Sequence, residues 1–176
     1  MRRIIMHWSA GTYTVSGLDR EHYHYIVDGD GAVVTGRFPV EANQVISRDR
    51  GYAAHTLNCN TGTIGVALAA MAGAIERPFK AGKFPITQDQ LTAFTGLVYK
   101  LSVQYNIPIT QETVLTHAEV QPTLGIKQRG KWDICWLPGM SASADPISVG
   151  NVLRRLIAAH KPSLATTILT KLGVIK

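Results

Sequence analysis

The order of strand-like and helix-like segments predicts an α/β fold, in which one domain has a central mixed β-sheet flanked by helices. An apolar run at residues 4–8 has the length of a strand. A second, continuous apolar run at residues 63–71 is typical of a strand buried on both faces. A segment that begins at Thr87 repeats its apolar residues at helical spacing. Strands and helices that alternate in this way favour helices packed on a sheet.

The first half of the chain supplies most of the expected strands. Asp28-Gly29-Asp30-Gly31 is a strong hairpin turn signal, because aspartate and glycine tolerate the backbone conformations of tight turns. The expected elements are, in order, a strand at residues 4–8, a helical turn around 16–21, strands at 23–27 and 32–35, and the buried strand at 63–71.

The second half supplies the expected helices. Thr87 and Gln90 form a capping box at the start of the clearest helix, which Asn106 and Pro108 end. The pattern further predicts a strand at residues 113–116, an irregular loop at 121–140, a helix at 147–160 and a short helix at 163–172.

Length and composition are those of one globular domain. The chain has 176 residues, of which 45% are hydrophobic and 17% charged, so we expect a single domain over residues 1–176 with one full core. A net charge of +6 favours anionic partners such as bacterial cell wall or lipid headgroups. Because the basic residues form no stripe with stacking aromatics, we expect no nucleic-acid partner. We expect a monomer.

The chain shows no pattern for export or membrane insertion. The apolar run before His7 is far shorter than the ~7–15 apolar residues of a signal peptide. The longest apolar stretch, residues 64–75, is interrupted by glycines and is too short to span a membrane. Nothing in the spacing of Cys59 and Cys135 demands a disulfide, so we expect free buried thiols, which suit a reducing compartment.

Two histidines and one aspartate provide the ligand types of a catalytic zinc site. His7 ends the first expected strand, and His117 follows the strand at residues 113–116. Asp133 lies in a loop, rich in Gly, Lys and Trp, that must fold back near both. Two imidazoles and a carboxylate hold zinc with the fourth position open for water, which indicates metal-assisted hydrolysis. The competing interpretation is that each histidine is a packed or surface residue.

Four segments in a fixed order carry a family resemblance. They are Ile4-Ile5-Met6-His7-Trp8-Ser9-Ala10, then Tyr23-His24-Tyr25-Ile26-Val27 with Asp30-Gly31, then His55-x4-Asn60-x3-Ile64-Gly65-Val66, and finally His117-x-Glu119-Val120 with Lys131-x-Asp133. The chain resembles the zinc-dependent N-acetylmuramoyl-L-alanine amidases of the amidase type 2 and peptidoglycan-recognition-protein superfamily. Within that superfamily it is most similar to the short phage endolysins of amidase type.

The resemblance implies a zinc site at one end of the sheet, with three ligands, two catalytic side chains and two substrate-binding side chains. The implied zinc ligands, for one Zn²⁺ per chain, are His7, His117 and Asp133. The implied catalytic residues are Tyr23 and Lys131, and the implied substrate-binding residues are His55 and Asn60. A lysine ammonium and a tyrosine hydroxyl beside the metal are suited to stabilise the oxyanion that forms as the amide is attacked.

Three assignments stay open at this point. Cys135 lies two residues after Asp133 and could supply a thiolate ligand instead, although the lysine-x-ligand spacing favours the aspartate. Three roles are open for Glu119: a hydrogen-bond partner of a ligand histidine, a proton shuttle, or a structural carboxylate. His24 alternates with Tyr23 along the expected strand and so points to the other face, where we expect a structural role.

The implied reaction is hydrolysis of the amide between the lactyl group of N-acetylmuramic acid and L-alanine in peptidoglycan. A phage or prophage endolysin fits this chain: it would be made in the host cytoplasm without a signal peptide and act on the cell wall after release. A cytosolic amidase that recycles anhydro-muramyl peptides is the alternative within the same class. A non-catalytic peptidoglycan-recognition module is the alternative from another class, although such a module would be expected to lack a full ligand set.

The C-terminal segment carries cations without acids. After Asp145 there is no acidic residue, and aliphatic residues recur at helical spacing between the basic ones. The basic residues are Arg154, Arg155, Lys161, Lys171 and Lys176. This pattern predicts a basic amphipathic tail at residues 161–176 that contacts an anionic membrane. The simpler interpretation is a core-packing helix followed by a solvated end.

Overall fold

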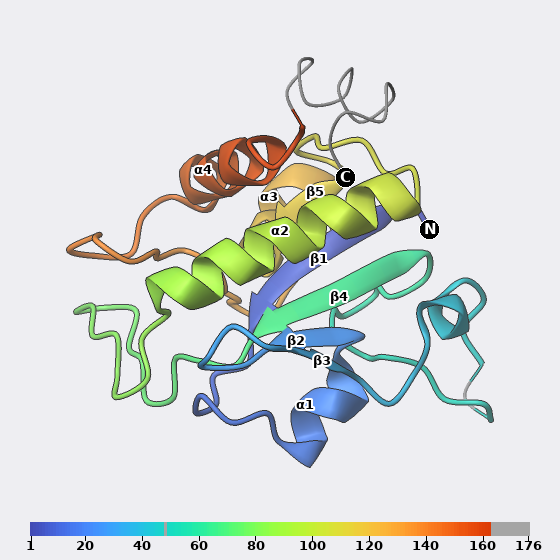
Figure 1. Ribbon diagram of the computed structural model, residues 1–176, viewed down its shortest axis with the longest axis horizontal. Helices are drawn as coiled ribbons and strands as arrows, with labels where there is room; N and C mark the ends of the chain where they lie inside the picture. Colours follow the sequence, from blue (N-terminus) through green and yellow to red (C-terminus); the bar gives the residue numbers. More distant parts are fainter. Residues whose placement is uncertain (48, 163–176) are drawn as a thin grey trace, which may run out of the picture.

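The computed structural model describes residues 1–47 and 49–162, with a five-stranded sheet at the centre (Figure 1). The strands are β1 (Arg3–Trp8), β2 (Tyr25–Val27), β3 (Val33–Thr35), β4 (Thr63–Leu68) and β5 (Val114–Thr116). Their order in the sheet is β3-β2-β4-β1-β5. β1 pairs in parallel with both β4 and β5, β2 is parallel to β4, and β3 is antiparallel to β2. This confirms the predicted α/β class with a mixed sheet.

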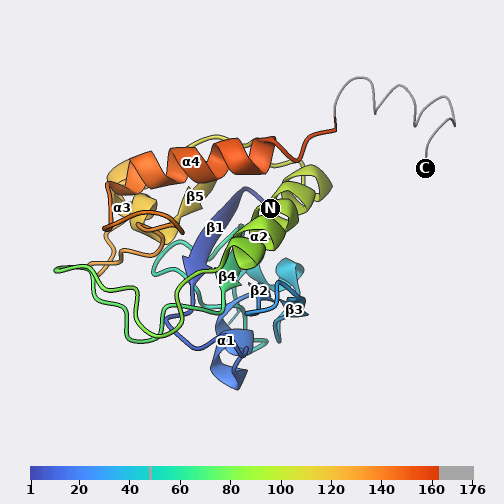
Figure 2. The same ribbon diagram turned by 60° about the vertical axis from the view of Figure 1, so that its left-hand side comes forward.

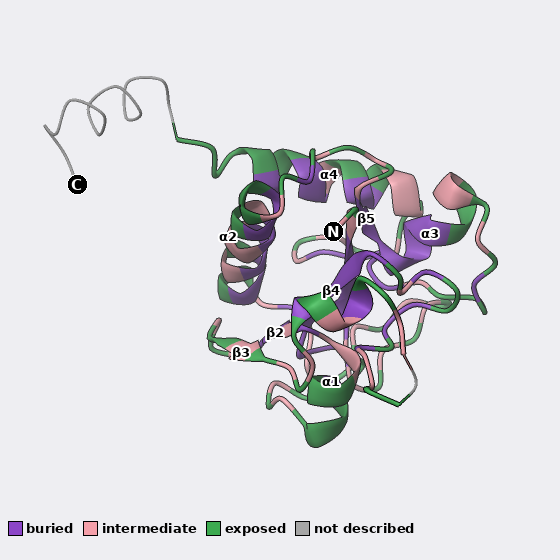
Figure 3. Ribbon diagram, turned by 90° about the vertical axis from the view of Figure 1, so that its right-hand side faces the viewer, coloured by how far each residue is buried: buried purple, intermediate pink, exposed green. Residues whose placement is uncertain are grey.

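Helices cover both faces of the sheet (Figures 1 and 2). They are α1 (Gly17–His22), α2 (Gln88–Gln104), α3 (His117–Leu124) and α4 (Pro146–Ala158), with a short 3-10 helix at Val40–Asn43. α2 and α4 share the larger core with one face of the sheet, and α3 packs on the other face. The sides of α2 and α4 that meet the sheet are buried, and their outer sides are exposed (Figure 3).

The alternation of side chains along β1 decides where the functional residues lie. Ile4 and Met6 point into the larger core under α2 and α4. Ile5 points the other way and packs with Val120 of α3. His7 follows Ile5 at the two-residue period of a strand, so its imidazole lies on the α3 face, at the carboxyl end of β1.

Capping boxes start three of the helices. The expected box of α2 is present: the Thr87 hydroxyl accepts a hydrogen bond from the Gln90 amide at 3.1 Å, and the Gln90 side chain accepts one from the Thr87 amide at 3.2 Å. Ser16 and Asp19 make the same arrangement at α1. These bonds satisfy backbone donors that a helix start otherwise leaves free, and they explain why the predicted helix starts are close to the observed ones.

Helix α3 differs from the prediction, because its second half, up to Leu124, lies in what we expected to be an irregular loop. The sequence contains a capping box here too, in which Thr116 and Glu119 bond each other's backbone amides. Pro122 inside the helix removes one backbone donor and so hides the helical pattern. Gly125, with φ of 70°, ends the helix in the left-handed conformation.

Two strand boundaries were also wrong. β4 ends at Leu68 instead of continuing to residue 71. β2 begins at Tyr25 instead of residue 23, because the backbone amide of Tyr23 donates to Asp19 at 2.9 Å and so closes the last turn of α1. Tyr23 therefore lies at a helix end, next to the sheet.

A buried ion pair ties α4 to α3 and β5. The two terminal nitrogens of Arg154 donate to Glu119 at 2.8 and 3.2 Å, and one of them also donates to the Val114 carbonyl at 2.9 Å. Glu119 is fully buried and Arg154 is 7% exposed. Burial raises the pKa of Glu119, and the ion pair with Arg154 opposes that rise. Glu119 is therefore a structural carboxylate without the solvent access that a proton shuttle needs.

Gly150 in α4 leaves room for the ion pair between α4 and α3. A methyl group at this position would overlap the Glu119 carboxylate. The pair also corrects the prediction for the C-terminal cations, since Arg154 is held inside the protein and is not free to meet a membrane. Val149, Leu153 and Ile157 of the same helix are buried in the larger core, as the simpler interpretation of this segment expected.

Several expectations concern the rest of the chain. Cys59 and Cys135 are both free and buried, as expected. Within residues 1–47 and 49–162, none of the helices has the length and apolar character needed to cross a bilayer. The short helix expected at 163–172 and most of the predicted basic tail at 161–176 lie outside the described residues.

We expect Arg154→Met to lower the free energy of unfolding by about 3–5 kcal/mol, because it leaves the Glu119 carboxylate buried without its partner. Urea denaturation at pH 7 measures the loss. Arg155→Met changes the exposed neighbour on the same helix and should alter stability by no more than ~0.5 kcal/mol. Equal stability of the two variants would show that the ion pair does not stabilise the fold.

Candidate metal centre

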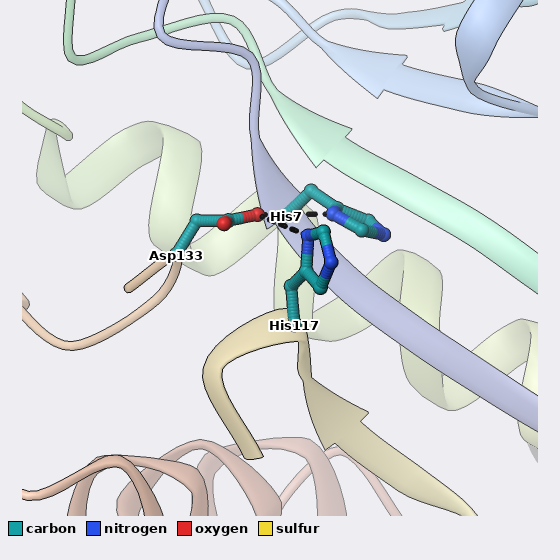
Figure 4. A group of neighbouring side chains, drawn as sticks. All are labelled: His7, His117 and Asp133. Atoms are coloured by element: carbon teal, nitrogen blue, oxygen red, sulfur yellow. Dashed lines mark hydrogen bonds and ion pairs between the residues drawn. The ribbon is translucent and has the colours of Figure 1, made fainter. Parts of the chain in front are cut away.

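Three side chains from distant parts of the sequence meet at the carboxyl end of the sheet (Figure 4). His7 is in β1, His117 is the first residue of α3 directly after β5, and Asp133 lies in the loop that follows α3. Nδ1 of His7 is 3.0 Å from Oδ2 of Asp133, and Nδ1 of His117 is 3.2 Å from the same oxygen. The three potential ligand atoms lie within 4.8 Å of one another, and all three residues are buried.

The parallel pairing of β1 with β5 brings the two histidines together. Met6 is paired with Thr116, so the next residue of each chain segment is a histidine at the same level of the sheet. Their ring centroids are 4.7 Å apart. The carboxyl ends of neighbouring parallel strands are where α/β folds commonly place their ligands.

The loop that carries Asp133 is held on both sides of this residue. The Asp133 carbonyl accepts a hydrogen bond of 2.7 Å from the amide of Ala118 in the first turn of α3. Ile134 is fully buried in the larger core, and the Cys135 carbonyl accepts a bond of 2.8 Å from Ala144. The Asp133 carboxylate is therefore presented to the histidines by a loop that is anchored through its backbone and its apolar side chains.

The electrostatics give these groups the protonation states that a metal needs. Burial lowers the pKa of His7 to about 4, so its imidazole is neutral at neutral pH. Burial alone would raise the pKa of Asp133, but hydrogen bonds with His117 and His7 outweigh it and lower the pKa to about 2. A neutral imidazole and an ionised carboxylate are metal ligands without further loss of protons. With a second imidazole beside them, this donor set fits a zinc ion.

Cys135, the competing third ligand, is not part of this group of three among the described residues. Burial, together with nearby carboxylates such as Glu76 and Asp133, raises the pKa of its thiol to about 12. The thiolate is the form that binds a metal, so this environment favours Asp133 as the third ligand.

The two predicted catalytic side chains line a cavity beside the three potential ligands. This cavity has a volume of about 280 Å³, and its lining includes Tyr23, Lys131, His117 and Asp133. Lys131 is exposed at the opening. The Tyr23 ring lies 5.1 Å from the His7 ring, centroid to centroid, and burial raises the pKa of its hydroxyl, which therefore stays protonated and able to donate.

A larger cavity of about 490 Å³ adjoins the first one. The two share His55, His117, Arg129 and Lys131 as lining residues, so together they form an extended groove that passes His117 and Asp133. Arg129 and Lys131 make this groove cationic. Another cavity of about 500 Å³, at residues 38–51, shares no lining residue with either.

The two predicted substrate-binding residues also hold structure in place. Nδ1 of His55 lies 3.2 Å from Nε2 of His7, so this imidazole contacts a potential ligand directly. A side chain at Gly65 of β4 would overlap the His55 ring, which explains a glycine in the middle of a strand. Oδ1 of Asn60 accepts hydrogen bonds from the amides of His55 at 3.1 Å and Thr56 at 2.8 Å. Both residues line the larger cavity, and their contact with substrate stays a prediction.

His24 is buried in a structural position, but the prediction that it points to the opposite face from Tyr23 was wrong. Tyr23 packs with Ile26, and His24 shares the face of Ile26 by the two-residue alternation of a strand. Nδ1 of His24 accepts a hydrogen bond of 2.9 Å from the Gly65 amide, and the residue is 1% exposed. Burial lowers its pKa to about 4, so the imidazole is neutral.

Sequence reasoning missed Gln128, whose Oε1 lies 3.0 Å from Nε2 of His117. A glutamine in an irregular loop carries no periodicity or motif that singles it out. The general rule that a ligand histidine hydrogen-bonds a partner through its second nitrogen indicates that such a residue should exist, but not which one.

Comparisons with known proteins agree with this architecture. Residues 1–139 match the family described as N-acetylmuramoyl-L-alanine amidase. The N-acetylmuramoyl-L-alanine amidase LysC from Clostridium intestinale URNW is 17% identical, with a TM-score of 0.50 over 86% of this chain and 83% of that chain. The endolysine N-acetylmuramoyl-L-alanine amidase LysCS from the same organism is 16% identical, with a TM-score of 0.50 over 86% and 81%. No curated protein matches the sequence.

At such low identities the two solved structures show a shared fold. The family match spans most of the 176 residues and includes all of the residues that carried the resemblance in the sequence. The chain therefore belongs to the N-acetylmuramoyl-L-alanine amidase family.

Proposed function

We propose that the chain is a zinc-dependent hydrolase that cleaves the amide between N-acetylmuramic acid and L-alanine in peptidoglycan, and that it serves a phage or prophage as an endolysin. The buried set of His7, His117 and Asp133 beside an open groove is the observation that carries the proposed zinc chemistry. The family match supports the amide bond as the target. The lytic role is supported by the resemblance to short phage endolysins.

In the proposed mechanism the three ligands hold the zinc, and side chains that line the groove stabilise the charge that develops on the substrate. Zinc bound by the three side chains would supply Lewis acidity at the scissile amide. Lys131 would place its ammonium group near the carbonyl oxygen, where negative charge develops during attack. The protonated hydroxyl of Tyr23 would donate a hydrogen bond to the same oxygen or orient the attacking water. Both side chains line the smaller cavity, which supports this assignment.

The larger cavity is the proposed site for the rest of the substrate. It continues from the potential ligands along His55 and Asn60, and it is cationic at Arg129 and Lys131. A stem peptide bears carboxylates, so this charge favours its binding. Cleavage would take place in the host cell wall after the protein has left the cytoplasm.

The ligand set is tested by metal analysis. We expect purified wild-type protein to hold one zinc per chain and His117→Ala to lose zinc and activity together, because two ligands cannot hold the ion as three do. Cys135→Ser is the matched control and should retain both. Full zinc occupancy in His117→Ala, or loss of zinc in Cys135→Ser, would contradict the assignment.

The catalytic roles are tested by variants that keep the metal. Lys131→Ala should retain zinc and lose on the order of 10²-fold or more in kcat, as removal of one oxyanion donor does in other enzymes. Tyr23→Phe should show a smaller loss of the same kind. Lys127→Ala, in the same loop but outside both cavities, should leave kcat unchanged. Turnover in Lys131→Ala close to that of Lys127→Ala would make Lys131 a surface charge.

The choice between the three candidate functions is tested with two substrates. An endolysin should clear a suspension of purified sacculi and release peptides with free N-terminal L-alanine. A recycling amidase should cleave soluble anhydro-muramyl peptides and leave sacculi intact. Binding to sacculi without any new amino termini would identify a recognition module and refute the proposed hydrolysis. The membrane contact of the tail stays a prediction.

A further inference from the structure

The side chain of Gln128 is fixed in a single orientation by its neighbours. Its amide nitrogen donates to the carbonyl of Leu57 at 2.9 Å and to that of Ile126 at 3.3 Å. Carbonyl oxygens only accept, so the amide nitrogen must lie on this side and the amide oxygen on the other. The residue is 6% exposed, and its backbone amide donates to the side chain of Gln121 at 2.8 Å.

This orientation determines which nitrogen of His117 carries the hydrogen. Oε1 of Gln128 lies 3.0 Å from Nε2 of His117, and an amide oxygen has only lone pairs to offer. Nε2 of His117 must therefore be the donor in this hydrogen bond, so Nδ1 is the nitrogen that is left to bind a metal. That Nδ1 is the atom that faces Oδ2 of Asp133 at 3.2 Å. A nitrogen and a carboxylate oxygen that face each other at this distance share either a proton or a metal ion, and metal binding would release the proton.

His7 has a similar arrangement on the other side of the site. Its Nε2 lies 3.2 Å from Nδ1 of His55, and Nε2 of His55 lies 3.3 Å from the Thr63 hydroxyl oxygen. The Thr63 hydroxyl donates to the Cys59 carbonyl at 2.7 Å, so its oxygen is free to accept from His55. Nδ1 of His55 also lies 2.8 Å from the Thr56 hydroxyl oxygen. Nδ1 of His7 faces Asp133 at 3.0 Å, so both histidines turn Nδ1 toward the carboxylate and Nε2 toward an outer partner.

The outer partners of the two histidines, His55 and Gln128, are both connected to the segment at residues 55–60. His55 starts the segment at residues 55–60, and Gln128 is hydrogen-bonded to the Leu57 carbonyl within it. Residues of this segment line the larger cavity of the groove. The orientation of the ligand histidines and the position of the groove wall are therefore connected through one set of hydrogen bonds.

We propose that Gln128 is a positioning residue for the metal: it holds His117 in the tautomer whose Nδ1 binds the ion and connects this ligand to the wall of the substrate groove. The proposal rests on the proposed zinc binding. Outer partners of ligand histidines typically change metal affinity by about 10–100-fold when they are removed. Gln128 is suited to this role because its two carbonyl partners prevent the amide from turning over.

Two substitutions test separately the two roles of Gln128, as the acceptor for His117 and as the donor that anchors the loop at Leu57. Gln128→Met has a similar shape but no acceptor, and we expect it to weaken zinc binding by about 10–100-fold in a chelator competition assay. Gln128→Glu keeps an acceptor oxygen for His117 but loses the donor to Leu57, and we expect zinc binding within about threefold of wild type. Gln121→Ala removes the bond to the Gln128 backbone and serves as the matched control, with unchanged zinc affinity. Equal weakening in Gln128→Met and Gln128→Glu would overturn the proposal and leave Gln128 as a loop anchor.

A spectroscopic measurement on metal-free protein tests the tautomer directly. Nitrogen-15 NMR of the histidine rings should show His117 of the wild type with its hydrogen on Nε2, and Gln128→Met should shift it toward a mixture of the two tautomers. A hydrogen on Nδ1 and none on Nε2 in the wild type would overturn the proposal even if the variants fail to fold. Zinc titration of the wild type decides the proposed function separately, since a protein that binds no zinc can still show the Nε2 tautomer.

Discussion

The register between β1 and β5 is the constraint on which the rest of the site depends. The two strands are parallel neighbours, and their pairing of Met6 with Thr116 sets His7 and His117 side by side at the carboxyl end of the sheet. Side chains alternate between the faces of a strand, so a slip of one residue would turn one imidazole into the opposite face. β1 is buried along nearly its whole length, and the packing of both its faces holds this register.

The polar residues around the candidate metal site form successive layers of hydrogen bonds. Arg154 of α4 neutralises Glu119, which in turn caps the helix that begins with His117. Gln128 and His55 contact the outer nitrogens of the two imidazoles. Each layer satisfies hydrogen bonds that burial would otherwise leave unmade, at a cost of about 1–3 kcal/mol for each such group. The two Nδ1 atoms and Oδ2 of Asp133 are thereby turned toward one another.

The groove opens beside this candidate metal site. The two cavities share residues of the loop between α3 and Asp133 and of the segment at 55–60, so the walls of the groove and the supports of the ligands are the same pieces of chain. Loops carry function while the sheet and helices beneath them supply rigidity. Lys131 illustrates the division, because its charge is exposed at the opening while Asp133, two residues later, is buried and fixed.

The sequence alone determined the features that depend on local patterns: the α/β class, the buried central strands, the capping box at Thr87, the helix that contains Leu153, and a set of residue types suited to zinc. Tertiary structure alone grouped Asp133 and not Cys135 with the two histidines, buried Arg154 in an ion pair with Glu119, and brought Gln128 to His117. The reason is physical. Periodicity and capping reflect interactions between residues a few positions apart, whereas these three outcomes depend on how an aperiodic loop and a distant helix pack against the end of the sheet.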